Sequence, residues 1–157
     1  MALKEVLIQE FEASFKMIRT AISRMKGEFW KEDENHWSYG FALFHVIETV
    51  DFYLSDSQEQ WKPLTDISRI PEEKQTEELG KKEMSFFLNY QVSAEKKFKE
   101  VFERLSEEQL LEKDGYASFG FQCRAHKFSY ILRHSMVHLG EMSKSLRQRS
   151  MDRIKWE

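Results

Sequence analysis

Three of the five histidines are spaced so that their side chains can converge inside a helical protein. His134 and His138 stand four positions apart in a stretch with helical periodicity, which places both on one helix face, about 6 Å apart along the axis. His45 belongs to a second such stretch, on an inward line with Phe41 and Phe52. The pattern predicts two helices that each present imidazole groups to a shared core, as in bundles that hold metal ions between facing helices.

Three converging imidazoles suit a divalent metal ion. A buried neutral histidine needs partners for its ring nitrogens, and an apolar helix face offers few. An ion at ~2.0–2.1 Å from three nitrogens supplies one partner for each ring and leaves an open position for water or substrate. All-nitrogen ligation suits zinc, nickel, iron or copper. The alternative is that the three histidines are packing residues whose polar atoms are satisfied without an ion.

The other two histidines lie too far along the chain to join the same ion. His126 comes eight residues before His134, about 12 Å along a helix, and His36 comes nine residues before His45, about 13.5 Å away. We expect both in loops or at helix ends, with His126 as a candidate for the mouth of a pocket.

Three further polar residues lie one turn from a proposed ligand. Glu48 follows His45 by three positions and is the candidate catalytic residue, as a hydrogen-bond acceptor for a ligand imidazole or as a base toward metal-bound water. The competing interpretation is a partly exposed glutamate at the pocket edge. Glu141 follows His138 by three positions, and a helix-surface carboxylate is the preferred interpretation over an orienting role. Tyr130 is expected to pack as an aromatic ring.

The elements that must position these residues are long helices. Glycine and proline together make up only 8 of the 157 residues, which argues against a β-sandwich or barrel. Apolar residues recur at steps of three and four in four stretches, roughly 2–28, 34–55, 76–105 and 123–149. The sequence therefore predicts an all-α fold over 1–157, a single four-helix bundle domain.

The connections between these stretches differ in length. A short piece near 29–35 predicts that the first two helices are antiparallel neighbours. Residues 56–75 hold both prolines and predict a long crossover between the second and third helices, with one helical turn starting at Pro71. In the irregular piece 106–122, a capping-box pattern at Ser106 predicts a short helix, and Asp114-Gly115 predicts a turn.

Charge and cysteine content exclude several classes of protein. The 24 basic and 27 acidic residues give a net charge of −3, which provides no field for nucleic acid. The single cysteine allows neither an internal disulfide nor a cysteine-based zinc site. No run of about 18 apolar residues or signal-peptide core is present, so we expect a cytoplasmic protein without a membrane partner.

The histidine motifs resemble those of the DinB/YfiT-like superfamily of metal-dependent proteins. The matching strings are Phe-His-Val-Ile-Glu, which ends at Glu48, and His-Ser-Met-Val-His-Leu-Gly-Glu, which begins at His134. The resemblance extends over the whole chain and implies a bundle of up-down-down-up order, a homodimer, and a divalent ion on His45, His134 and His138. Zinc or nickel is the expected ion, with iron as a further option. Family members with an assigned activity include thiol S-transferases that use a low-molecular-weight thiol cofactor.

Two functions of different classes follow. The first is a metal-dependent enzyme, a hydrolase or thiol S-transferase, that acts on a small-molecule substrate. The second is a non-enzymatic helical dimer that serves as a binding or interaction module and uses its histidines for structure only. Exposed Phe or Trp side chains on the first or third helix would mark the interface of such a module.

Overall fold

Helices account for nearly all the regular structure of this protein. The computed structural model describes residues 1–32 and 37–157, so the expected loop or helix-end position of His36 lies outside the described residues. The four longer helices are α1 (Leu3–Ser23), α2 (Tyr39–Tyr53), α4 (Met84–Arg104) and α6 (Arg124–Gln148). The shorter ones are α3 (Glu72–Gly80), α5 (Glu107–Leu110) and the 3₁₀ turns Phe29–Lys31, Asp66–Arg69 and Ala117–Phe119. The described residues include no β-strand, which confirms the all-α prediction.

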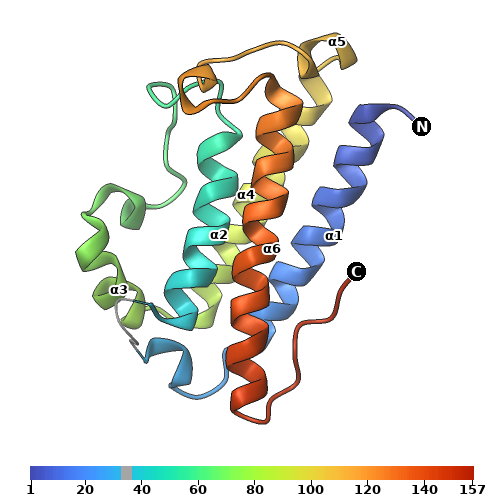
Figure 1. Ribbon diagram of the computed structural model, residues 1–157. Helices are drawn as coiled ribbons and strands as arrows, with labels where there is room; N and C mark the ends of the chain where they lie inside the picture. Colours follow the sequence, from blue (N-terminus) through green and yellow to red (C-terminus); the bar gives the residue numbers. More distant parts are fainter. Residues whose placement is uncertain (33–36) are drawn as a thin grey trace.

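The four longer helices lie side by side, and α3 stands outside them beside α2 (Figure 1). In the view of Figure 1, α1 and α6 run downward, whereas α2 and α4 run upward. Both α2 and α1 pack mainly on α4 and α6. The predicted antiparallel neighbours α1 and α2 do contact each other, but over a shorter stretch than either shares with α4 or α6. Their connection extends from residue 24 to residue 38, which is long enough to carry α2 to the opposite side of the core.

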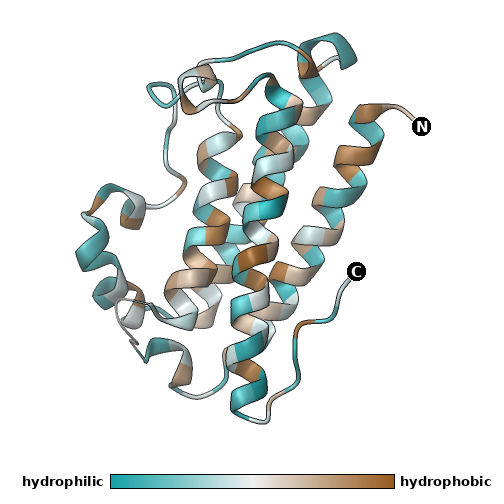
Figure 2. Cartoon of the chain, viewed as in Figure 1, coloured by the Kyte–Doolittle hydropathy of each residue, from teal (hydrophilic) through white to brown (hydrophobic). Residues whose placement is uncertain are grey.

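Aromatic side chains fill the space between α1, α4 and α6. Phe11 on α1 stacks on Phe98 of α4 with ring centroids 4.7 Å apart, and Phe98 lies 4.4 Å from Phe102. Phe128 on α6 completes the group at 4.9 Å from Phe102. Figure 2 shows hydrophobic and hydrophilic residues alternating along each long helix, as expected when one face of the helix is buried. Burial of these rings is a large hydrophobic contribution to stability, about 2–3 kcal/mol for each side chain.

The predicted third helix is divided in two. The periodicity predicts one helix over 76–105, but α3 ends at Gly80 and α4 begins at Met84. The charged residues Lys81, Lys82 and Glu83 lie between them. The two helices bury their faces against different partners, since α3 packs on α2 whereas α4 packs on both α1 and α2. The crossover thus holds the nine-residue helix α3 rather than the single turn expected at Pro71. Pro71 is the N-cap residue of α3.

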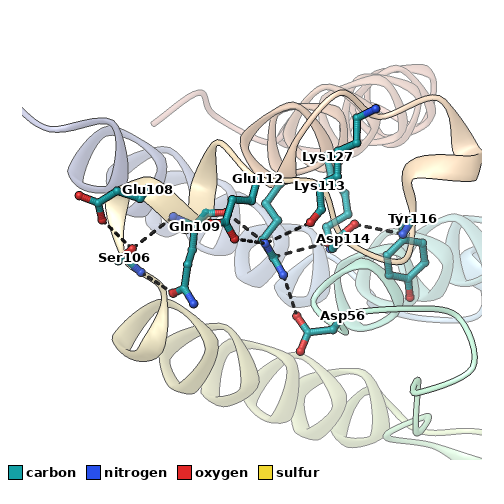
Figure 3. A network of polar contacts seen from close by, with 10 residues as sticks. Asp56, Ser106, Glu108, Gln109, Glu112, Lys113, Asp114, Tyr116 and Lys127 are labelled. Atoms are coloured by element: carbon teal, nitrogen blue, oxygen red, sulfur yellow. Dashed lines mark hydrogen bonds and ion pairs between the residues drawn. The ribbon is translucent and has the colours of Figure 1, made fainter.

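A polar loop fixes the beginning of α6 (Figure 3). The predicted capping box is confirmed, because Ser106 Oγ accepts from the backbone nitrogen of Gln109 and Gln109 Oε1 accepts from that of Ser106. Arg124, the first residue of α6, donates to the carbonyl of Gln109 and has Asp56, Glu112 and Asp114 around its guanidinium. These contacts attach the crossover and the 106–122 segment to the end of α6.

The Asp114-Gly115 turn requires glycine for a steric reason. The backbone nitrogen of Gly115 donates to the carbonyl of Asp56 at 2.9 Å. A Cβ atom on Gly115 would lie only 2.2 Å from Cβ of Ser57. The approach of the two loops is therefore possible only without a side chain at this position.

Candidate metal centre

The three predicted ligands come together where α2 packs on α6. His45 lies midway along α2, and its neighbours Phe44 and Val46 are fully buried. His134 and His138 lie one turn apart on α6, on either side of the buried Ser135 and close to the buried Leu139. The backbone around each histidine is therefore held by the core, whereas the imidazoles are half-buried and reachable from outside.

The imidazoles are close enough to share one ion. One ring nitrogen from each of His45, His134 and His138 lies within 4.8 Å of those of the other two. Nε2 of His134 lies 3.0 Å from Nε2 of His45, which suits a hydrogen bond between neutral rings. The same spacing is close to the ~3.3 Å expected between two nitrogens that bind one tetrahedral zinc ion. The geometry therefore fits both a ligated ion and a metal-free hydrogen-bonded pair.

The environment favours the neutral form of two of these rings, His45 and His134. Burial, followed by the positive charges that His45 and His138 would carry, lowers the pKa of His134 from 6.5 to about 4. Burial also lowers the pKa of His45, and the neighbouring His138 adds to that effect. Neutral imidazoles have a lone pair available at physiological pH, so an ion can bind His45 and His134 without displacing a proton.

Glu141 contacts one of the predicted ligands. Its Oε2 lies 2.7 Å from Nδ1 of His138, three positions earlier on α6. A proton on Nδ1 that is donated to this carboxylate leaves the lone pair of Nε2 free to bind a metal. Glu141 is exposed, as the preferred sequence interpretation has it, yet it also makes the orienting contact that the alternative interpretation proposed.

A pocket of about 320 Å³ opens beside the histidines. Its lining includes His45, His134 and Glu48, so the candidate catalytic residue reaches the same space as two of the ligands. Burial raises the pKa of the Glu48 carboxyl above its usual range; the Ser68 hydroxyl opposes this shift, and the charges of Asp51 and Glu72 add to it. The half-buried Glu48 thus agrees with the interpretation of a partly exposed glutamate at a pocket edge, and its acid–base role stays a prediction.

The pocket walls come from α2, the crossover, α3 and α6, and the sequence predicted only part of them. Tyr130 lines the pocket and packs at 5.6 Å from the ring of His134, in line with its predicted aromatic role. Trp61 and Ser68 from the crossover, together with Gln75 of α3, complete the lining and were not predicted. The one signal for them is Trp61, the sole aromatic residue in 56–75, because a large ring in a stretch without periodicity must find cover elsewhere in the fold.

His126 stays apart from the three-histidine cluster, as its spacing predicts. It is exposed in the first turn of α6, where its Nδ1 accepts from the backbone nitrogen of Gln122 at 3.3 Å. With Tyr53 and Tyr130 it lines a second hollow of about 350 Å³. Both tyrosines also line the first pocket, so the two hollows share Tyr53 and Tyr130 as a common wall.

No protein-family model, curated protein or solved structure matches this chain. The resemblance to the DinB/YfiT-like superfamily therefore stays a prediction. Within the described part of the chain, no helix has the length and apolar character needed to cross a membrane.

Proposed function

We propose that this protein is a metal-dependent enzyme of DinB/YfiT-like type that acts on a small molecule in the pocket beside the three histidines. The proposed ligands of the divalent ion are His45, His134 and His138. The proposed reaction class is hydrolysis or thiol transfer, and the second would use a low-molecular-weight thiol. The observation that carries the proposal is the convergence of three ring nitrogens within 4.8 Å at the edge of a pocket.

Residues of the chain would each have a separate role in this reaction. A divalent ion bound there supplies Lewis-acid chemistry to a molecule that enters the open side. Glu141 would keep the proton of His138 on Nδ1, and thereby its lone pair on Nε2. Glu48 would take up a proton from a molecule held in the pocket, a role that its raised pKa favours by bringing the carboxyl nearer to neutral pH. The aromatic walls would exclude water from the bound molecule.

We take the fold to be a four-helix bundle of up-down-down-up order, which the helix directions in Figure 1 support. Zinc or nickel is the proposed ion, with iron as a further option, because all-nitrogen ligation suits these metals. The proposed setting is the cytoplasm, and the proposed assembly is a homodimer with neither nucleic acid nor membrane as a partner.

Metal analysis of matched variants tests the proposal. Purified wild-type protein, incubated with zinc and then desalted, should retain about one ion per chain, as a three-histidine site predicts. His134→Ala should retain at least about tenfold less, since it removes one of three ligands. His126→Ala is the control, because it removes an exposed histidine outside the cluster, and it should retain as much as wild type. If wild type and His134→Ala hold equal trace amounts and unfold at the same temperature, the metal site is wrong.

A second function, the non-enzymatic dimer module, is favoured by one surface feature. Met84, Leu88 and Val92 follow one another at four-residue steps along α4, and all three are exposed. Such an apolar stripe is typical of a helix that packs on a partner. The expected marker is missing, however, since no Phe or Trp stands among the exposed large apolar residues of α1 and α4 as described.

Light scattering tests whether the α4 stripe is a dimer interface, which either function could use. If the stripe forms a dimer interface, Val92→Glu should convert the dimer to monomers without changing zinc binding. A dimer that survives this substitution would remove the α4 stripe from consideration. A pocket of about 320 Å³ beside the histidines, which is within the size range of small-molecule sites, favours the enzyme as the primary function.

A further inference from the structure

The pocket beside the histidines has rigid aromatic walls. Phe52 meets Trp61 with ring centroids 4.9 Å apart and planes at 87°, and it meets Tyr53 at 4.8 Å and 78°. Tyr53 in turn meets Tyr130 at 5.6 Å and 80°. Each ring is held edge-on by the next, so the walls are already in place before a ligand arrives. Preformed walls reduce the entropy that binding must overcome.

One carboxylate supplies the charge of this pocket. Among the described lining residues, Glu48 is the single side chain of the Asp, Glu, Lys and Arg types. The charged groups that act on it, Asp51 and Glu72, are also acidic, and no described cation compensates it. Asp51 is neutralised by its own ion pair with Lys97 at 2.6 Å, whereas the exposed Glu72 adds to the negative charge around Glu48.

We propose that the pocket binds a small molecule carrying a protonated amine, with the ammonium group against Glu48 and the apolar body against Phe52, Trp61 and Tyr130. Such a ligand supplies the missing positive charge in a place where a bare carboxylate is costly. Aromatic rings also favour a cation over a neutral group of equal size, because their faces carry negative electrostatic potential. Trp61 lines the same pocket, and its indole nitrogen is buried without a hydrogen-bond partner among the described residues.

The proposed metal ion refines this ligand class, and this refinement rests on the proposed function. Glu48 lies one turn from His45, about 4.5 Å further along the helix axis. A divalent ion on the histidines would place two positive charges at one end of a pocket that has a negative charge at the other. The complementary ligand then carries an anionic donor group toward the ion and an amine toward Glu48, because a simple amine would be repelled by the ion.

Metal-free protein tests the amine site independently of the metal. Phenethylamine and 2-phenylethanol share a shape and differ in charge, and their affinities can be measured by calorimetry at neutral pH. We expect the amine to bind at least about tenfold more tightly than the alcohol, because that is the affinity difference that one partly buried ion pair provides. In protein labelled with ¹⁵N, the indole N–H signal of Trp61, assigned with Trp61→Phe, should shift on addition of the amine.

Two variants show whether Glu48 is responsible. Glu48→Gln should abolish the preference for phenethylamine over the alcohol, whereas Glu73→Gln, which removes an exposed acidic group of α3 outside this pocket, should keep it. Equal affinities for the two compounds in wild type, or an unchanged preference in Glu48→Gln, would overturn the amine site. Both results are obtained without zinc, so they stand apart from any failure of the metal proposal.

A zinc-loaded sample tests whether the ligand carries an anionic group toward the metal ion. Zinc should tighten the binding of 4-(aminomethyl)benzoate, which has a carboxylate opposite its amine, and weaken that of benzylamine, which lacks the carboxylate. If zinc changes both affinities in the same direction, or neither of them, the proposed anionic end is wrong. If the protein retains no zinc at all, the proposed function has failed while the amine result stands.

Discussion

Nε2 of His45 on α2 lies 3.0 Å from Nε2 of His134 on α6, although 89 positions separate the two residues in the sequence. This contact joins two helices that pack on each other over much of their length. Because the helix backbones are held by the buried residues around each histidine, the imidazoles meet in a fixed geometry. The candidate metal site, the local charge and the pocket therefore share this contact.

The contact between Glu141 and His138 predicts a loss of metal affinity on substitution. Glu141→Gln replaces a charged acceptor at 2.7 Å from Nδ1 by a neutral amide, which weakens the orientation of the ring. We expect zinc affinity to fall by about tenfold, the lower end of the range for such outer contacts. Competition with a chromophoric chelator measures the change. Glu10→Gln, at an exposed position on α1, is the control, and an equal loss in both variants would remove the orienting role.

The lowered pKa of His134 predicts a dependence of stability on pH in metal-free protein. The folded protein takes up the His134 proton only near pH 4, whereas the unfolded chain takes it up near 6.5. The unfolded state therefore binds more protons in that interval, and stability is lost as the pH falls through it. The histidine contributes on the order of 1 kcal/mol after allowance for solvent screening.

His134→Gln provides the comparison for this pH effect. The variant lacks the titrating group, so its free energy of unfolding should vary less than that of wild type between pH 6.5 and 4. Urea unfolding at several pH values measures both slopes. Parallel slopes for the two proteins would show that His134 does not titrate as its burial requires.

Glu48 is expected to reduce the stability of the fold at neutral pH. Burial raises its pKa in the folded protein, so the folded state holds the proton more tightly than the unfolded chain, whose carboxyl has a pKa of 4.5. The charged form is therefore the destabilising one, and its cost is present above the raised pKa and absent below 4.5. Glu48→Gln should raise the free energy of unfolding at neutral pH, as measured by urea unfolding. A gain that persists unchanged below pH 4.5 would contradict this explanation.

The ion pair between Lys97 and Asp51 predicts a larger loss of stability on substitution than the effects expected at His134 and Glu48. Lys97 Nζ lies 2.6 Å from Oδ1 of Asp51, whose side chain is fully buried, and it also donates to Ser55 Oγ at 3.1 Å. Lys97→Ala leaves the buried carboxylate without its cation, which should cost about 3 kcal/mol. Lys96→Ala removes an exposed lysine whose nearest carboxylate is 3.9 Å away, and it should change stability by less than about 0.5 kcal/mol. Thermal unfolding of both variants gives the comparison, and similar losses would contradict it.

Local patterns in the sequence were sufficient for most of the helices. Steps of three and four between apolar residues predicted the regions of α1, α2, α4 and α6, and the capping box at Ser106 predicted α5, because these signals act within a few turns. The same patterns joined α3 to α4, since periodicity alone does not report that two consecutive helices bury their faces against different partners. They also predicted too short a connection between α1 and α2, because the apolar periodicity does not mark the end of α1 at Ser23.

The candidate site was likewise predicted in part from the sequence. Spacing alone selected His45, His134 and His138 from five histidines, because residues four apart share a helix face wherever that helix is placed. The sequence by itself thus determined an all-α protein with three imidazoles on inward faces. Only the tertiary structure brought α2 against α6, placed Trp61 of the crossover in the same pocket as Glu48, and left that carboxylate without a cation among the described residues. Helical periodicity is local, whereas the choice of packing partner depends on how whole surfaces fit across long stretches of chain.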